Sequence, residues 1–413
     1  MNGRGKALLP GPRSPDNRIR PNVEMPRRNS HGAWMRLHMR ILQLAPLWEA
    51  VPPPAYGGTE SVVSLLTEEL VRMGHDVTLA ACGESRTSAP LLSVYERSLR
   101  SADDLADRSP YDWQHTATAL KHGRDYDIIH NHAGELPMAM SALIDTPILT
   151  TTHCLTTADN AFVWNHYRGA YNTISRSQLA HFDGFTPPAR SMGYVYNAVD
   201  IDSFPFEACK GDDLLFLSRI SPEKGPHLAI EVARRTGRRL LMAGKVDRAD
   251  RPFFEEVVRD LIDGDQVVFL GEADAAMKRH LYKNALCMLL PLTWEEPFGL
   301  VMAEAMACGT PVVALRRGSS PEIIAHGETG FVVDTVEEMV DAVAEVPTID
   351  PYACRRHVRE HFSPQSMAGS YLEVYERVLT EESTRPAAVP AASIFVNPTS
   401  AANRSFAPAR TAS

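Results

Sequence analysis

The sequence has no long apolar run and no excess of positive charge. A membrane-spanning helix needs about 20 consecutive apolar residues, and no run in the 413 residues approaches that length. The formal net charge is -9, whereas proteins that bind nucleic acid usually present a basic face. Hydrophobic residues make up 44% and charged residues 23% of the chain, as in ordinary soluble globular proteins. We therefore expect neither a membrane-spanning nor a nucleic-acid-binding protein.

Cysteine is scarce and forms no recognisable pairing pattern. The six cysteines are Cys82, Cys154, Cys209, Cys287, Cys308 and Cys354. No two of them form a Cys-x-x-Cys pair, so we expect reduced, buried thiols in a cytoplasmic protein rather than disulfides or a zinc site. An internal repeat of the solenoid type is also missing.

Both ends of the chain differ in composition from the middle. Residues 1–38 hold eight Lys and Arg against two Asp and Glu, without the apolar segment of a signal peptide. We expect a disordered basic extension there, and Met39 resembles a native start. The tail, 383–413, is rich in Ala, Pro, Ser and Thr and should also be disordered. Contact of the extension with anionic lipid stays open, although a solvated extension is the simpler interpretation.

The first half of the middle region contains a βαβ unit. A strand at 41–44, a helix at 60–72 and a strand at 76–81 predict a parallel sheet, which further strands at 127–130 and 147–150 extend. A second series then begins near residue 213. It has strands at 214–217, 240–243 and 267–270 and helices at 226–236 and 252–262.

The length also favours two units, because 413 residues are too many for one ordinary core. We predict an α/β protein with two Rossmann-like domains, 39–205 and 206–364, that face each other across a cleft. In open α/β sheets, ligands bind at the carboxyl ends of the strands. Candidate functional residues are therefore expected in the loops that follow strands.

One such loop joins an apolar strand to a short helix. The run at 285–292 is continuously apolar and predicts a fully buried strand, followed by a polar loop at 293–297. Helix should begin near Phe298 or Gly299 and end at Cys308, with Gly309 as its stop. The loop thus lies where a sheet of this kind binds its ligand.

Glu296 lies just ahead of that helix and Glu304 lies inside it. The first N–H groups, near Gly299 and Leu300, have no partner within the helix and attract oxygen anions. Two carboxylates and free N–H groups can therefore surround one polar ligand. The alternative is that one Glu is a helix N-terminal charge and the other a solvated helix residue.

The segment that runs from Glu296 through Phe298 and Glu304 to Ala314 resembles the signature of the family 4 glycosyltransferases. Members of that family are retaining, nucleotide-sugar-dependent enzymes with the two-domain GT-B fold. The resemblance implies that Glu296 contacts hydroxyls of the donor sugar and Glu304 the nucleotide ribose. It also implies that a last helix, 365–382, crosses back and packs on the first domain.

The turn Ser218 to Gly225 resembles the diphosphate-binding turn of that family. Arg219 offers a planar fork of donors and Lys224 a movable point charge. Taken alone, the turn could equally be a solvated charged loop. Together with the Glu pair, it predicts that both cations stabilise a departing diphosphate.

Three further positions resemble parts of the same donor site. Gly57 and Gly58 open the first helix of the other domain, where glycine allows a close backbone approach and the helix start supplies N–H donors. The sequence there is neither a Walker loop nor Gly-x-Gly-x-x-Gly, so dinucleotide binding lacks its fingerprint. His153 follows a strand and matches a histidine that contacts the sugar, and Gly271 begins a turn that meets the base.

A metal site has weaker support. The Asp-x-Asp motif of metal-dependent glycosyltransferases occurs at 125–127, 200–202 and 263–265, and each copy has a local explanation. His130 and His132 lie close together, but no third ligand is suitably spaced. We expect no obligatory metal and no cofactor beyond the nucleotide-sugar.

Ala198 is a small departure from the family pattern, because the family usually has Gly at this position.

The sequence therefore predicts a cytoplasmic, metal-independent, retaining glycosyltransferase. The donor is a nucleoside diphosphate sugar, with uracil as the expected base and guanine or adenine as alternatives. The acceptor, a small molecule, a glycan or a lipid-linked molecule, stays open. Two other functions also stay open: an epimerase or hydrolase of the same donor, and a non-catalytic binding protein.

Overall fold

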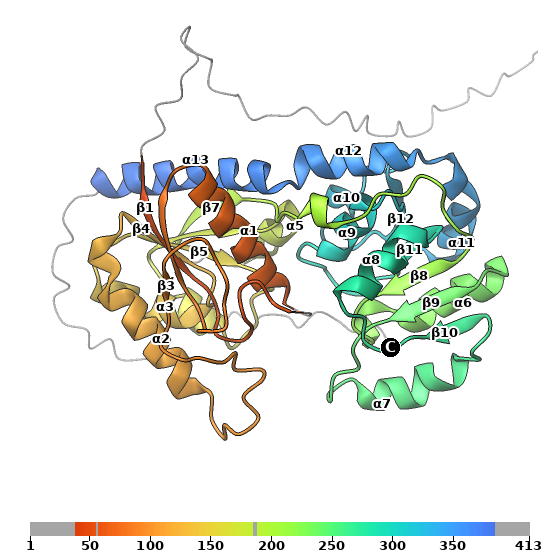
Figure 1. The fold of residues 1–413 in the computed structure, drawn as a ribbon, viewed down its shortest axis with the longest axis horizontal. Coiled ribbons are helices and arrows are strands. Elements are labelled where there is room, and N and C mark those ends of the chain that lie inside the picture. Colours follow the sequence, from red (N-terminus) through yellow and green to blue (C-terminus); the bar gives the residue numbers. More distant parts are fainter. Residues whose placement is uncertain (1–37, 55–56, 185–187, 385–413) are drawn as a thin grey trace, which may run out of the picture. The chain divides into compact units, whose positions relative to one another are not determined.

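The computed structural model describes residues 38–54, 57–184 and 188–384 (Figure 1). Nearly all of the two stretches predicted to be disordered, 1–38 and 383–413, lies outside the described residues. The tail prediction begins too early, because Ser383 is still helical. No helix within the described ranges is long and apolar enough to cross a membrane.

The first sheet has seven parallel strands within the described part of the chain, in the order β3-β2-β1-β4-β5-β6-β7. They are β1 (Arg40–Leu44), β2 (Asp76–Ala80), β3 (Leu91–Leu92), β4 (Ile128–Asn131), β5 (Ile148–Thr152), β6 (Ala170–Thr173) and β7 (Arg190–Tyr194). The helices of this region are α1 (Gly58–Arg72), α2 (Ser109–Lys121), α3 (Glu135–Met140), α4 (Ala161–Trp164) and α5 (Arg176–Ala180). The strand order reverses between β1 and β4, where a sheet of this kind opens a crevice for a ligand.

The second sheet has six parallel strands in the described chain, in the order β10-β9-β8-β11-β12-β13. They are β8 (Leu214–Leu217), β9 (Leu240–Ala243), β10 (Val267–Phe269), β11 (Cys287–Leu290), β12 (Val312–Leu315) and β13 (Gly330–Val333). The helices are α6 (Pro226–Thr236), α7 (Arg251–Phe253), α8 (Ala275–Asn284), α9 (Leu300–Ala307), α10 (Ser320–Ile323), α11 (Val336–Glu345) and α12 (Pro351–His361). Here the order reverses between β8 and β11.

Burial on both faces explains why β8 is apolar at every position. Leu215 and Leu217 point into a core shared with α8, α9 and α12. Leu214 and Phe216 point into a second core, shared with α6 and α11. Successive side chains of a strand alternate between faces, so a parallel sheet covered by helices on both sides needs apolar residues throughout.

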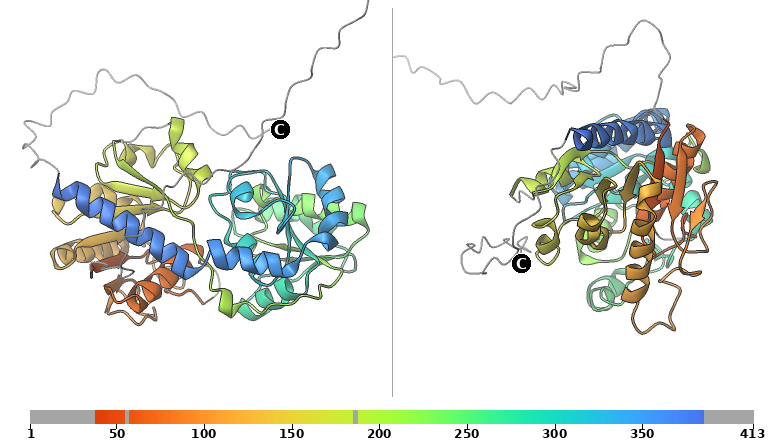
Figure 2. Two further views of the ribbon diagram at one scale, coloured as in Figure 1. Left: turned by 90° about the horizontal axis from the view of Figure 1, so that it is seen from above. Right: turned by 90° about the vertical axis from the view of Figure 1, so that its left-hand side faces the viewer.

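The last helix, α13 (Pro364–Ser383), confirms the predicted return to the first domain. Met367, Tyr371 and Val374 are buried in the same core as Ile41 and Val62, and Figure 2 shows α13 lying beside the first sheet. The helix starts at a proper cap, because the Ser363 hydroxyl accepts a hydrogen bond from the Ser366 amide. The fold is therefore α/β with two Rossmann-like sheets and a crossing C-terminal helix.

Some elements differ from the expected ones. Residues 251–261 do form a helical segment, but it changes from α7 to a π turn and then to a 3-10 turn. Strand β6 was not expected, since its Asn172 and Thr173 are polar; both are buried and hydrogen-bonded. The prediction of buried thiols is wrong for Cys154 and Cys209, which are exposed, whereas the other four cysteines are buried; all six are free.

Candidate functional site

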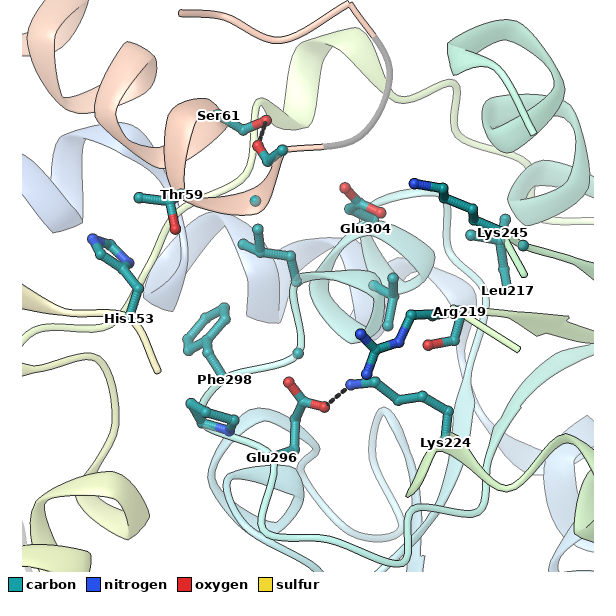
Figure 3. A pocket seen from close by; sticks show the side chains of 18 of the residues that line it. Thr59, Ser61, His153, Leu217, Arg219, Lys224, Lys245, Glu296, Phe298 and Glu304 are labelled. Atoms are coloured by element: carbon teal, nitrogen blue, oxygen red, sulfur yellow. Dashed lines mark hydrogen bonds and ion pairs between the residues drawn. The ribbon is translucent and has the colours of Figure 1, made fainter. Parts of the chain in front are cut away.

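The predicted residues gather around one cavity of about 600 Å³ at the carboxyl ends of β8, β9 and β11 (Figure 3). The lining includes Gly57, Gly58, His153, Arg219, Lys224, Glu296, Phe298, Gly299, Leu300 and Glu304. Gly271 is not part of the lining, although the two residues after it are. The Gly271 carbonyl instead accepts a hydrogen bond from the Gly244 amide at 2.8 Å. A contact between this turn and a base stays a prediction.

Lys224 and Glu296 form the central ion pair of the cavity. Lys224 lies in a 3-10 turn, Pro222–Lys224, after β8, and its Nζ bonds Glu296 Oε2. Trp294 Nε1 donates to the same oxygen at 3.1 Å, and the Lys224 ammonium lies 4.6 Å from the centroid of the Trp294 ring. No described protein group hydrogen-bonds Glu296 Oε1. This oxygen is left to accept a hydrogen bond from a ligand hydroxyl.

The backbone around Gly299 lets α9 begin close to Glu296. Gly299 has φ +75°, and a Cβ there would lie 2.6 Å from Met302 Cε and 3.2 Å from Glu296 Cγ. Ser319 fastens the same loop, because its amide donates to the Glu296 carbonyl at 2.9 Å and its hydroxyl to the Phe298 carbonyl at 2.7 Å. The free N–H groups at the start of α9, from Leu300 on, therefore lie beside the carboxylate.

Arg219 lines the cavity, but acidic side chains already hold it. Its guanidinium bonds Glu223 and lies 3.5 Å from Asp250 and 3.8 Å from Asp247. Lys245, which follows β9 and was not predicted, pairs with Asp247 at 2.8 Å. Its position directly after a strand was the available signal. A diphosphate entering here would compete with these carboxylates for both cations.

Glu304 is neither solvated nor free. Lys278 Nζ donates to its Oε1 at 2.9 Å and the Tyr282 hydroxyl to its Oε2 at 2.9 Å. The alternative of a solvated helix residue is therefore wrong, and a ligand must share these oxygens with α8. Neither partner carried a sequence signal, because their contact with Glu304 depends on how α8 packs against α9.

The glycine loop reaches the cavity from the first sheet. A Cβ on Gly58 would lie 3.4 Å from Leu300 Cδ1, the first residue of α9. Gly57 has φ +153°, and its carbonyl accepts a hydrogen bond from the Ser61 hydroxyl at 2.8 Å. The start of α1 therefore faces the start of α9, and both present N–H groups to the same space.

His153 ends a buried chain of hydrogen bonds. His153 Nε2 lies 2.9 Å from His132 Nδ1, and His132 Nε2 lies 3.0 Å from Gln43 Oε1. Gln43 Nε2 donates to the Tyr375 hydroxyl at 3.1 Å, which in turn lies 2.7 Å from His130 Nδ1. The chain thus connects the cavity to α13.

The direction of these bonds assigns the protons. Gln43 Oε1 can only accept, so His132 Nε2 must donate and His132 Nδ1 must accept. His153 Nε2 therefore carries its proton, and its Nδ1 is an acceptor. In Figure 3 one ring nitrogen of His153 points toward the cavity. A neutral His153 can accept a hydrogen bond from a ligand hydroxyl there.

Burial keeps this group of histidines uncharged. It lowers the pKa of His153 to about 4 and holds the pKa of His130 and His132 well below 6.5. The pKa of each histidine is lower in the folded protein than in the unfolded protein, so the unfolded state binds more protons below pH 6.5. The contribution of these neutral histidines to the stability of the fold is therefore complete above pH 6.5 and is lost as the pH falls below it.

We expect unfolding measurements to show this loss. Below pH 6.5 the unfolded state takes up protons that the folded histidines do not, so the free energy of unfolding should drop between pH 7.5 and pH 5.5, by about 1.4 kcal/mol from His153 alone. Urea titrations at both pH values measure it. The variant His132→Gln should show a smaller drop, and an unchanged drop would contradict the assignment.

The side chains considered as metal ligands have other partners. Both ring nitrogens of His130 and His132 are hydrogen-bonded within the protein. Asp127 pairs with Arg40 at 2.7 Å, and Asp263 accepts bonds from the amides of its own turn. Within the described ranges, no group of three or more His, Cys, Asp or Glu side chains could hold a metal ion.

Two family models match successive parts of the chain. The model described as Glycosyltransferase Family 4 matches residues 56–202, and the model described as Glycosyl transferases group 1 matches residues 203–357. The two matches meet between the two sheets and together cover the cavity residues from Gly57 to Glu304, but not Pro46 and Trp48.

Curated relatives are similar over different lengths. A D-inositol 3-phosphate glycosyltransferase of Mycobacteroides abscessus is 35% identical over 214 residues, which is 47% of this chain and 48% of the relative. The chain thus spans about half the length of that relative. A phosphatidyl-myo-inositol mannosyltransferase of Mycolicibacterium smegmatis is 27% identical over 381 residues, 82% of this chain and 94% of the relative.

Solved structures share the fold. A glycosyltransferase involved in avilamycin A biosynthesis is 26% identical, with a TM-score of 0.63 over 83% of this chain and 98% of its own. The HepE protein of Anabaena, solved in complex with UDP and glucose, is 17% identical, with a TM-score of 0.62 over 82% of this chain and 100% of its own. The chain therefore belongs to the glycosyltransferases of family 4 and has their GT-B fold.

Proposed function

We propose that the protein is a retaining glycosyltransferase that moves a sugar from a nucleoside diphosphate sugar to an acceptor hydroxyl, without an obligatory metal ion. The observation that carries this proposal is the convergence of Lys224, Arg219 and Glu296 in one cavity with two helix N-termini and His153. Cations and N–H groups favour a diphosphate. The free oxygen of Glu296 and Nδ1 of His153 favour hydroxyl groups. A nucleotide-sugar carries both kinds of group.

In this proposal each side chain has a distinct role. Lys224 and Arg219 bind the diphosphate, with the N–H groups near Gly299 and those of the glycine loop at Gly58. Glu296 and His153 orient the sugar, and Glu304 contacts the ribose. Each charge-assisted contact contributes about 1.5–3 kcal/mol net. The contacts accelerate the reaction only as far as they strengthen while the leaving group gains charge.

Retention is proposed because the chain resembles a family of retaining enzymes, and the partners of Glu296 do not favour it as a covalent nucleophile. Glu296 is the carboxylate nearest the predicted sugar position, and it is already paired with Lys224 and Trp294. We therefore assign attack to the acceptor hydroxyl on the face that the diphosphate leaves. The bond from the anomeric carbon to the acceptor oxygen forms as the bond to the phosphate oxygen breaks. The hydroxyl proton passes to that phosphate oxygen.

Uracil is the proposed base and the cytoplasm the proposed location. The structural neighbour HepE, which shares the fold, was solved with UDP. In this chain the turn after β10 supplies Glu272 and Ala273 to the cavity wall, and backbone groups there could meet a base.

The test is a donor panel with purified full-length protein. UDP-, GDP- and ADP-sugars labelled with ¹³C in the sugar are incubated with a metabolite extract, with and without EDTA, and products are followed by mass spectrometry and NMR. We expect a labelled glycoside with the donor's anomeric configuration, in the presence of EDTA. Free sugar or an epimer without any acceptor would replace the proposal by a hydrolase or epimerase. Donor binding without any product would leave a binding protein.

A further inference from the structure

A second cavity, of about 320 Å³, adjoins the first. The segment after β1, the loop after β4 and helix α2 line it, and it shares Pro46 and Trp48 with the larger cavity. It lies where the strand order of the first sheet reverses, between β1 and β4. Ligands of open α/β sheets bind at such a position. The residues assigned to the donor leave this space unused.

Two exposed tryptophans form part of its wall. Trp48, after β1, is 43% exposed, and Trp113, on α2, is 56% exposed. Large aromatic rings are usually withdrawn from water, so two exposed ones at a single cavity indicate a ligand surface. The face of an aromatic ring is negative and attracts polarised C–H groups. Carbohydrate rings present such C–H groups on their faces.

Two carboxylates, those of Asp112 and Glu135, line the cavity. No described protein group donates a hydrogen bond to the Asp112 carboxylate, and burial raises its pKa. Glu135 accepts one bond, from Asn160 Nδ2 to its Oε1 at 2.7 Å, which leaves Oε2 for a ligand. The Nε2 atom of His115 is hydrogen-bonded to the Ala45 carbonyl at 2.9 Å. The cavity therefore offers carboxylate oxygens to a ligand that can donate.

No Lys or Arg belongs to the lining of this cavity among the described residues. The nearest arginines contact the Trp48 ring and are engaged elsewhere. Arg100 pairs with Glu49, and Arg108 donates to the carbonyls of Leu99 at 2.8 Å and Ala102 at 3.1 Å. Within the lining, a phosphate or carboxylate would therefore meet two carboxylates and no cation.

We propose that this second cavity holds the acceptor, and that the acceptor is a saccharide without phosphate or carboxylate groups. Its hydroxyls donate to Asp112 and Glu135, its ring lies against Trp113, and one hydroxyl reaches the donor past Pro46 and Trp48. The inference rests on the proposed transferase activity. A neutral acceptor would distinguish this chain from its relative, the D-inositol 3-phosphate glycosyltransferase, because the compound in that name carries a phosphate.

Binding, measured without turnover, tests the proposal. Full-length protein saturated with UDP is titrated with maltose and with maltose 1-phosphate by saturation-transfer NMR, and with N-acetylglucosamine and its 1-phosphate in the same way. We expect each neutral saccharide to bind at least tenfold more tightly than its phosphate. Equal or tighter binding of the phosphates would overturn the proposal, and so would no binding by any of the four probes.

Two variants test whether the neutral saccharide binds in the second cavity. Trp113→Ala and Asp112→Asn should each weaken neutral saccharide binding about tenfold, and both positions are accessible enough to change without opening a core. Phe162→Ala is the matched control, since Phe162 is 72% exposed and does not line the cavity. If Trp113→Ala and Asp112→Asn lost no more affinity for the neutral saccharide than Phe162→Ala, the saccharide would not bind in this cavity.

UDP affinity, measured by calorimetry on the same variants, should stay within twofold of the original protein. This separates the two proposals. A protein that binds neutral saccharides but no nucleotide-sugar would refute the transferase and leave the saccharide site. A protein that binds donor but prefers phosphorylated saccharides would refute only the acceptor class.

Discussion

Replacing Lys224 with alanine should lower kcat by about 10²–10³-fold and change donor affinity by less than tenfold. The Lys224 ammonium lies in the cavity beside Glu296, where the proposed leaving diphosphate gains charge. A preorganised cation stabilises that developing charge more than the ground state. Steady-state kinetics and calorimetry, with the donor that the panel selects, measure the two quantities.

Two controls separate charge stabilisation from damage to Glu296. In the single variant, Glu296 keeps only Trp294 as a partner, so the double variant Lys224→Ala with Glu296→Gln removes the uncompensated carboxylate. It should be slower than Glu296→Gln alone if the cation itself matters. Lys283→Ala, which removes a surface pair with Glu207 at 3.8 Å, should leave kcat unchanged. Equal losses in turnover and affinity for Lys224→Ala would contradict the assigned role.

Replacing Gly225 with alanine should lower the free energy of unfolding by about 3–5 kcal/mol. Gly225 follows Lys224 directly and has φ +69°, and a Cβ there would overlap the Pro291 carbonyl oxygen. The same turn is joined to the loop of the second sheet, because the Thr293 amide donates to the Glu223 carbonyl at 3.0 Å. Any shift of the turn therefore also moves Lys224, and kcat should fall with stability.

Gly237 provides a matched control at the other end of α6. It has φ +66°, close to that of Gly225, but a Cβ there meets nothing within 4 Å. Gly237→Ala should thus show only the cost of a left-handed backbone, about 1–2 kcal/mol. Urea unfolding of both variants gives the comparison. Similar losses in the two would show that the close approach to Pro291 is unimportant.

Much of the second domain followed from local patterns. The strand at 214–217 and the helix at 226–236 were predicted with their observed bounds, because a continuous apolar run and a helix between Gly225 and Gly237 are signals within a few residues. The loop that carries Glu296 was also predicted from local signals, although the strand before it is shorter than expected and α9 begins at Leu300. Strand β6 was missed, since its polar residues are satisfied by partners far along the chain.

The candidate site divides in the same way. The residue types at Lys224, Arg219 and Glu296, and their positions after strands, were visible in the sequence. The three acidic partners of Arg219 and the pairing of Glu304 with Lys278 and Tyr282 were not.

The sequence by itself determined the α/β class, part of the order of strands and helices, and which of the candidate charged residues follow a strand. These depend on apolar spacing, caps and turns, each set by neighbours within a few residues. Only the tertiary structure decided that Lys224 meets Glu296, that Tyr375 of α13 orients the histidines behind His153, and that Trp48 and Trp113 share a cavity. These contacts depend on strand order and on the crossing of α13, and no local pattern encodes the distance between residues brought together by folding.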